Sequence, residues 1–292
     1  MTGPRRFKQV DVFTSVPFKG NPLAVVLNGD GLSDAQMHAL ARWTNLSETT
    51  FALAPTAPEA DYRVRIFSPG VEFPFAGHPT LGTAHALLEA GLKPKTPGRL
   101  VQQCGVGLVN VSIAAGGALA FEAPQANLQG LHPGLFASLR SALGSDAFST
   151  VPEPVIAEMG ITWLVVRMDS AEACLAAQPN LEALREITRR GITGIAMFGA
   201  HGPAGPADYE VRVIFTKLDA LAEDPVTGSA NACIARVLEA QGFPDGAHSS
   251  RGYSARQGTL QQCDGRISVS YVDGVPWIGG HSVTVIDGKL RF

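Results

Sequence analysis

Two titratable residues stand at equivalent places in an internal repeat of this sequence. Gly77–Ala86 aligns without gaps with Glu223–Ala232, and the alignment places His78 opposite Asp224. Each lies just ahead of an apolar stretch that we predict to be a helix. Equivalent polar residues in two duplicated domains are typical of a shared active site that receives one group from each side. The alternative is a purely local role, as a helix cap for Asp224 or as a backbone partner for His78.

The same repeat places a glycine and a hydroxyl residue together in each half. These pairs are Gly82-Thr83 and Gly228-Ser229, and we expect both to lie at the start of a helix. The first turn of a helix has backbone N–H groups without intrahelical partners, which makes it a site for anions. A single glycine before a helix is usually a turn or packing residue, so it is the repetition that favours a carboxylate clamp.

Glu48 is a third candidate, and it has no counterpart in the second half. A capping box at Ser33 to Gln36 starts a predicted helix that ends near Asn45, and Thr49–Leu53 has the composition of a strand. Glu48 therefore lies at a helix-to-strand junction, where rigid scaffolds often present functional groups. An exposed carboxylate without a function is the alternative.

The repeat also predicts the domain organisation. Tyr62–Ser68 returns as Tyr209–Thr216 with one inserted residue, and both copies have the pattern of a strand. The repeat distance from His78 to Asp224 is half of the 292-residue chain. We therefore expect two similar domains, 1–118 and 119–279, with 280–292 returning to the first.

Composition limits the classes of function. The chain is 45% hydrophobic and 17% charged, with a formal net charge of -3. That balance supplies no basic field for nucleic acid or for an anionic membrane, so we expect a small anionic molecule as the partner. The four cysteines are widely spaced, and neither a leader peptide nor a membrane span is evident, which predicts a cytoplasmic protein with reduced thiols. Nucleotide-binding, zinc-protease and hydrolase-elbow motifs are absent from the sequence.

Four ordered motifs resemble the PhzF-like family, which is named for phenazine biosynthesis. They are Gly20–Val26, Asn45–Phe51, Phe75–Gly82 and Glu223–Ala230. The resemblance implies an α+β, diaminopimelate epimerase-like fold, in which two pseudo-symmetric domains each wrap a mixed β-sheet around a central α-helix.

The resemblance also implies roles for particular residues. The glutamate of the S-E-T motif, Glu48, is expected to transfer the proton, and His78, Asp224 and Ser229 are expected to contact the substrate. Asn21 and Gly77 lie in the same motifs and join the expected substrate-binding residues. Epimerase and racemase relatives use one cysteine in each half, whereas the matching positions here hold His78 and Asp224, which excludes the two-thiol mechanism.

The resulting hypothesis is an isomerase that needs neither a cofactor nor a metal and that works as a homodimer. Its reference reaction is the isomerisation of trans-2,3-dihydro-3-hydroxyanthranilate by Glu48 in an interdomain cleft. Two alternatives stay open at this point. One is an epimerase or racemase of the same fold without the two cysteines, and the other is a binding or regulatory homologue that does no chemistry.

Overall fold

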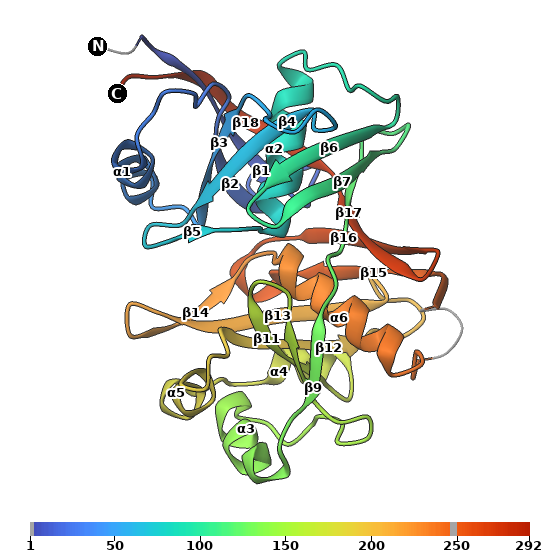
Figure 1. Cartoon of the computed structure of the whole chain (residues 1–292). Coiled ribbons are helices and arrows are strands. Elements are labelled where there is room, and N and C mark those ends of the chain that lie inside the picture. The colour runs from blue at the N-terminus through green and yellow to red at the C-terminus, as the bar shows by residue number, and fades with distance from the viewer. Residues whose placement is uncertain (1–2, 246–249) are drawn as a thin grey trace. The chain divides into compact units, whose positions relative to one another are not determined.

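The computed structural model of the chain describes residues 3–245 and 250–292, and it divides into two compact units. Unit 1 comprises Met1–Glu122 and Gly279–Phe292, and unit 2 comprises Ala123–Ile278 (Figure 1). The sequence placed the border four residues earlier, at 118/119. Those four residues form strand β8, which pairs with β7 of unit 1 and so continues the sheet of that unit.

Unit 1 contains nine strands and two helices within its described residues. They are β1 (Arg5–Val12), β2 (Asn21–Val26), α1 (Asp34–Thr44), β3 (Glu48–Leu53), β4 (Tyr62–Phe67), β5 (Glu72–Phe73), α2 (Gly77–Glu89), β6 (Arg99–Cys104), β7 (Gly107–Ile113), β8 (Leu119–Glu122) and β18 (Ser282–Leu290).

The strands of unit 1 form one mixed sheet. Its order is β18, β1, β2, β3, β4, β6, β7 and β8, with β5 added beside β4. The pairs β2–β3 and β4–β6 are parallel and the others are antiparallel. Each parallel pair is joined through a helix, α1 or α2, as parallel strands require a crossover connection.

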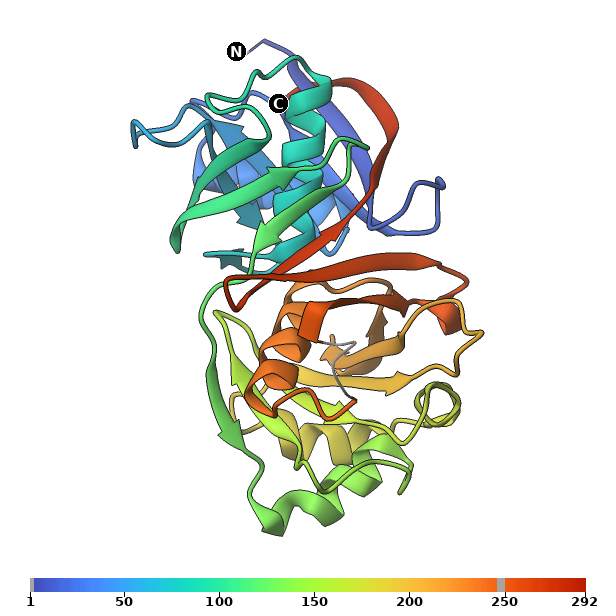
Figure 2. The ribbon, with the colours of Figure 1, turned by 90° about the vertical axis from the view of Figure 1, so that its right-hand side faces the viewer.

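Helix α2 is the centre of unit 1. It contacts β1, β2, β3, β8 and β18, and Figures 1 and 2 show strands of this unit on several sides of it. Nine of its 13 residues are buried, including every residue from Gly77 to Ala84. A helix that is buried on most sides must be apolar around its circumference. Leu81, Ala84 and Ala86 meet that requirement.

The chain returns to unit 1 at its end, through β18. This strand pairs antiparallel with β1, from Arg5 opposite Leu290 to Val12 opposite Ser282. The buried Lys8 of β1 strengthens the join, because its Nζ lies 2.8 Å from Glu89 of α2 and 2.7 Å from Asp287 of β18. The amino group thus ties the first strand to the central helix and to the last strand.

Unit 2 contains the remaining elements. They are β9 (Asn127–Gly130), a 3₁₀ turn (Pro133–Leu135), α3 (Phe136–Leu143), β10 (Val155–Glu158), β11 (Thr162–Arg167), α4 (Ala171–Ala176), α5 (Leu181–Thr188), β12 (Gly194–Ala200), β13 (Tyr209–Lys217), β14 (Ala220–Asp224), α6 (Gly228–Ala240), β15 (Gly252–Gln257), a second 3₁₀ turn (Thr259–Gln261), β16 (Gly265–Val272) and β17 (Val275–Gly280), whose last two residues belong to unit 1.

Unit 2 repeats the strand pattern of unit 1. Its strands are ordered β9, β10, β11, β12, β13, β15 and β16, with β14 beside β13. The parallel pairs are β11–β12 and β13–β15, at the places that β2–β3 and β4–β6 hold in unit 1. Helix α6 takes the central place and contacts β10, β11 and β12. The predicted α+β class and the sequence repeat are both realised.

Among the helices that the structure describes, α6 is buried over the longest stretch. Eleven consecutive residues, from Gly228 to Leu238, are buried, and Asn231 and Arg236 are among them. Asn231 donates to the Thr227 carbonyl, and the Arg236 guanidinium donates to the carbonyls of Ala123 and Pro124. These bonds satisfy polar groups that would otherwise destabilise the core.

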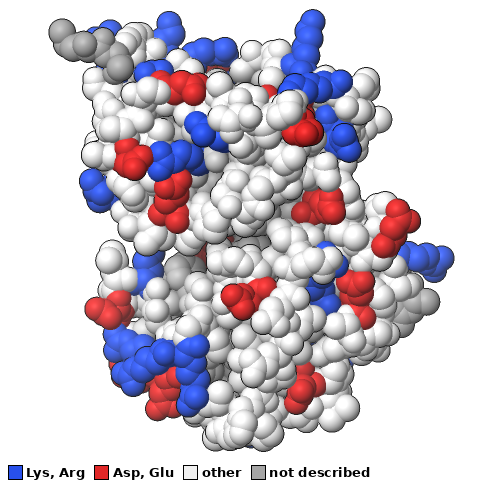
Figure 3. Space-filling model, viewed as in Figure 1, with Lys and Arg blue, Asp and Glu red and all other residues white. Residues whose placement is uncertain are grey.

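Charged side chains of both signs are interspersed on the face drawn in Figure 3, except for a group of basic side chains over α5. Arg185, Arg189 and Arg190 belong to this part of unit 2. Within the described part of the chain, no helix is both long enough and apolar enough to cross a membrane.

Gly20 offers a test of how closely β1 and β2 approach. A Cβ atom at this position would lie 2.2 Å from the Val12 carbonyl oxygen, which is backbone and cannot turn aside. We expect Gly20→Ala to lower the free energy of unfolding by about 2 kcal/mol or more, measured by urea denaturation. Gly70→Ala is the control, since an added Cβ there meets nothing within 4 Å. Equal stability of the two variants would contradict this packing.

Candidate active site

Glu48 and His78 meet in unit 1. Glu48 is the first residue of β3, and His78 is the second residue of α2. The Nε2 atom of His78 lies 3.3 Å from the Oε2 atom of Glu48, and the two side chains are 7% and 15% exposed. A carboxylate and an imidazole at this distance can share a proton or present both groups to one small molecule.

Local structure explains why Glu48 occupies this place. The predicted capping box is confirmed, because Ser33 and Gln36 each accept a hydrogen bond from the other's backbone N–H at the start of α1. Asn45 ends the helix in the left-handed conformation, with φ of 54°. The chain then enters β3, where Glu48 lies opposite Leu23 of the parallel strand β2.

Burial sets the charge state of His78. Its side chain is buried, and desolvation lowers the pKa of the imidazole to about 3. The ring is therefore neutral near pH 7, with one nitrogen as a donor and the other as an acceptor. A neutral histidine beside Glu48 can donate an N–H to a developing negative charge without competing with the carboxylate for protons.

The predicted start of the first repeat helix was wrong. Helix α2 begins at Gly77, five residues before Gly82, so the amides of Gly82 and Thr83 belong to its second turn, where intrahelical bonds occupy them. Proline is tolerated in the first turn, so Pro79 does not prevent the early start. The first-turn amides of α2 are those of Gly77 and His78, and Thr80 already donates to Ala76.

The second repeat helix starts where the sequence placed it, at Gly228. Gln257, a fully buried residue of β15, holds the preceding turn in a non-helical form. Its amide nitrogen donates to the Asp224 carbonyl and to the Thr227 hydroxyl, and its amide oxygen accepts from the Thr227 backbone N–H. The Thr227 hydroxyl donates in turn to the Asp224 carboxylate at 2.5 Å. The first-turn amides of α6 are those of Gly228, Ser229 and Ala230.

The two repeat hydroxyls have different partners. In unit 1 the fully buried Thr83 donates to Thr50 at 2.8 Å. In unit 2 the indole N–H of Trp163 donates to the Ser229 hydroxyl at 3.1 Å. Thr83 therefore donates its hydroxyl hydrogen within the core of unit 1, whereas the buried Ser229 accepts a hydrogen bond at the start of α6.

An arginine holds the strand that precedes each repeat helix. Arg65 of β4 binds Glu72 of β5 through two bonds, and Arg212 of β13 binds Glu223 of β14 in the same way. The two arginines are equivalent in the repeat. Paired bonds of this kind fix direction as well as distance. Glu223 is next to Asp224, so the pair holds the end of β14 in place.

The remaining predicted residues, Asn21, Gly77 and Gly82, lie in unit 1. Asn21 is fully buried as the first residue of β2, opposite Val12. Gly77 begins α2, and Gly82 packs so tightly that an added Cβ would meet the Leu23 side chain at 2.6 Å. Within unit 1 the structure brings Glu48 together with His78, and within unit 2 it places Asp224 and Ser229 on the two sides of one turn.

Sequence reasoning missed two residues that organise the site, Gln257 and Trp163. Each acts on a segment that is distant in the chain, since 66 residues separate Trp163 from Ser229. A buried glutamine in a strand and a tryptophan in a predicted core are ordinary features of a sequence. Only the fold identifies their partners.

Burial suppresses the reactivity of two of the four cysteines. Cys174 and Cys233 are buried, and desolvation raises the pKa of the Cys233 thiol to about 12. A thiol with such a pKa is a poor nucleophile and a poor base near neutral pH.

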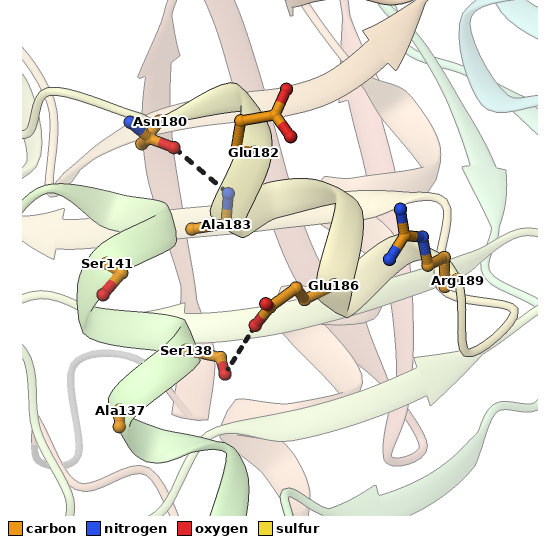
Figure 4. Close-up of a pocket in the computed structure, with 8 residues that line it drawn as sticks. All are labelled: Ala137, Ser138, Ser141, Asn180, Glu182, Ala183, Glu186 and Arg189. Carbon is orange, nitrogen blue, oxygen red and sulfur yellow. Dashed lines mark hydrogen bonds between the residues drawn. The ribbon is translucent and has the colours of Figure 1, made fainter.

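A polar pocket of about 450 Å³ lies between α3 and α5 of unit 2 (Figure 4). Its polar groups already serve the fold: Asn180 caps α5 through the Ala183 N–H, and Ser138 donates to Glu186. No predicted site residue lines this pocket.

Comparison with known proteins adds independent information. A family described as phenazine biosynthesis-like protein matches residues 10–288. A Schizosaccharomyces pombe protein called antisense-enhancing sequence 1 is 33% identical over 97% of both chains. The trans-2,3-dihydro-3-hydroxyanthranilate isomerase of Pseudomonas aeruginosa is 35% identical over 77% of this chain and 76% of its own.

The fold has a solved counterpart. A Bacillus anthracis phenazine biosynthesis protein of the PhzF family aligns over 100% of both chains, with a TM-score of 0.83 and 22% identity. At this identity the likeness concerns the fold alone, and it agrees with the epimerase-like fold predicted from the motifs.

The buried His78 predicts a pH-dependent stability. Its pKa is about 3 in the folded protein and 6.5 in the unfolded chain, so only the unfolded chain takes up this proton between those values. Stability is therefore lost as the pH falls below 6.5, by about 2 kcal/mol between pH 7 and pH 5. Urea denaturation at the two pH values should show this difference, and His78→Gln should reduce it by that amount.

The control for this measurement is Leu40→Ala. It removes buried apolar surface from α1 and no titratable group, so it should lower stability equally at both pH values. If His78→Gln keeps the full pH difference of the wild type, another group is responsible for it.

Proposed function

The chain belongs to the family of phenazine biosynthesis-like proteins and is an isomerase, and from this premise we propose that Glu48 moves a proton on a small carboxylated substrate. The substrate we propose is unsaturated, because a proton on carbon becomes acidic when the charge left behind spreads over a conjugated system. The single observation that carries the proposal is the pairing of Glu48 with a neutral, buried His78.

The chemistry we propose begins with the Glu48 carboxylate taking a proton from one ring carbon. The electron pair of the broken C–H bond enters the conjugated system. Glu48, now a carboxylic acid, returns the proton to a second carbon on the same face, and the resulting enol becomes a ketone. An N–H of His78 would stabilise the charge that develops between the two steps.

A comparison of the repeats supports one base rather than two. Arg65 and Arg212 are equivalent, and they lie opposite Phe51 and Met197 in the neighbouring strands. Three residues earlier, β3 has Glu48 and β12 has Gly194. A Cβ atom at Gly194 would lie 2.3 Å from the Ile214 carbonyl oxygen, so this position of unit 2 has no room for a carboxylate.

Unit 2 supplies binding groups in this proposal. The amides of Gly228 and Ser229 start α6 and suit a substrate carboxylate, as helix N-termini bind anions. Asp224 would accept a hydrogen bond from a hydroxyl or amino group of the same molecule. That the half-sites of both units serve one substrate is part of the proposal, and the repeat equivalence of His78 and Asp224 supports it.

The first substrate to test is trans-2,3-dihydro-3-hydroxyanthranilate, the compound named for the Pseudomonas aeruginosa relative. No observation favours an epimerase that uses thiols, because the two positions at which the resemblance expects cysteines hold His78 and Asp224. A homodimer in the cytoplasm stays our prediction for its assembly and location.

Replacing Glu48 tests the proton transfer. Glu48→Gln keeps the shape of the side chain but removes the basic oxygen, so turnover of this substrate should fall by roughly a hundred- to ten-thousand-fold. Product formation is followed by absorbance as the conjugation of the ring changes. Glu59→Gln, at an exposed glutamate, is the matched control and should keep the wild-type rate. Near-normal turnover by Glu48→Gln would sink the mechanism.

Turnover in heavy water distinguishes one base from two. A single shielded carboxylate returns part of the original hydrogen to the product, whereas two independent bases introduce solvent deuterium at the new centre. Complete deuterium incorporation would therefore count against a shielded Glu48.

Asp224→Asn tests the contribution of unit 2. A hydrogen bond to a charged acceptor is worth about 1.5–3 kcal/mol, so kcat/KM should fall by roughly 10- to 100-fold, mainly through KM. Asp219→Asn is the control, because Asp219 lies in the β13–β14 hairpin of the same unit with its side chain 97% exposed. Unchanged kinetics of Asp224→Asn would remove Asp224 from the site.

A further inference from the structure

We infer that Trp163 is a positioning residue, which fixes the Ser229 hydroxyl as a hydrogen-bond donor to a bound carboxylate. The inference rests on the proposed function, because it specifies how unit 2 holds the acidic group of the substrate. It concerns binding only, and it assigns no chemical step to Trp163.

The direction of the bond between the two side chains carries the argument. Trp163 of β11 and Ser229 of α6 are 5% and 6% exposed, and their Nε1 and Oγ atoms are 3.1 Å apart. An indole N–H can only donate, so the serine oxygen must be the acceptor. The hydroxyl hydrogen of Ser229 is then directed away from the indole.

That hydrogen is well placed to act together with backbone donors. Ser229 is the second residue of α6, so its own amide and that of Gly228 belong to the first turn. First-turn amides have no partner within the helix and lie where its dipole favours negative charge. A hydroxyl held in a fixed direction beside them adds a third donor for a carboxylate, with little loss of side-chain entropy on binding.

Unit 1 shows that this arrangement is not a general property of the fold. Thr83 stands where Ser229 stands in the repeat, and it donates its hydrogen to Thr50 inside the core. The strand positions explain the difference. Thr50 corresponds to Ala196, which has no hydroxyl, and Leu23 corresponds to Trp163. In unit 2 a donor has therefore replaced an acceptor as the partner of the helix hydroxyl.

A simpler explanation is that Ser229 merely satisfies a buried indole, since a buried tryptophan N–H usually has a hydrogen-bond partner. The two explanations differ in what Trp163 does to ligand affinity. If it only needs a partner, its removal acts on folding. If Trp163 orients the hydroxyl, its removal lowers the affinity for a carboxylate, and it does so only while the Ser229 hydroxyl is present.

A double-mutant cycle separates them, with benzoate as the probe. Its dissociation constant is measured by calorimetry for the wild type, Trp163→Phe, Ser229→Ala and the double variant. We expect each single substitution to weaken benzoate roughly tenfold, as one hydrogen bond to a charged group allows, and the double variant to bind no more weakly than Ser229→Ala. Trp43→Phe, the same change at an exposed tryptophan, is the control.

Three results would overturn the inference. They are benzoate failing to bind to the wild type, Trp163→Phe binding as well as the wild type, and the two single effects multiplying in the double variant. Benzoate is bound and not turned over, so the readout does not depend on Glu48. If the enzyme does not turn over its substrate but the benzoate affinities follow the expected pattern, only the proposed proton transfer is refuted. If turnover is normal but the effects of the two single substitutions multiply in the double variant, only this inference is refuted.

A spectroscopic measurement covers the case in which Trp163→Phe fails to fold. The indole N–H resonances of the wild type are assigned through Trp43→Phe and Trp277→Phe. Benzoate should shift the Trp163 resonance in the wild type, because the accepting oxygen polarises when its own hydrogen is donated. The shift should be absent in Ser229→Ala. The inference would also be overturned if the Trp163 resonance of the wild type did not shift when benzoate binds.

Discussion

Each unit is built around one helix that is buried on almost every side, and this burial constrains everything else in the unit. The sides of α2 and α6 must be apolar or small, and the few polar side chains along them need partners inside the core, as Asn231 and Arg236 have. Only the first turn of each helix has backbone N–H groups without intrahelical partners, so binding of an anionic group is expected there.

The duplicated framework has kept its topology and changed its side chains. Glu48 of unit 1 corresponds in the repeat to Gly194 of unit 2, which has no side chain. Thr50, a hydrogen-bond acceptor, corresponds to Ala196. Such exchanges leave strand pairing intact, because the pairing is made by backbone groups. The two units thus share a fold but differ in their functional groups. Unit 1 has the titratable pair Glu48 and His78, and unit 2 has a turn before α6 that is held by hydrogen bonds. Fold alone would not reveal this division.

Local signals made much of the fold predictable. The caps of α1 involve residues that are near neighbours in sequence. The strands of the repeat can be predicted from their alternation of apolar and polar residues and from the recurrence of the same pattern in the second half of the chain. The start of α2 could not be predicted in this way, because Pro79 reads equally well as a turn or as part of a first helical turn. The hold of Gln257 on the turn before α6 and the bond from Trp163 to Ser229 depend on tertiary contacts. Sequence patterns contain no record of those contacts.

The pairing of β1 with β18 has a consequence for synthesis on the ribosome. Unit 2 is one continuous segment, so its strands can pair as soon as they have emerged. Unit 1 must wait, because β1 lacks one neighbour, and Lys8 lacks the carboxylate of Asp287, until β18 has been made. Closing such a long loop is slow, and the unpaired edge of β1 is available to other chains in the meantime. The unit that contains Glu48 and His78 is thus completed after unit 2, and a nascent chain cannot acquire that pair in its final setting before β18 has emerged.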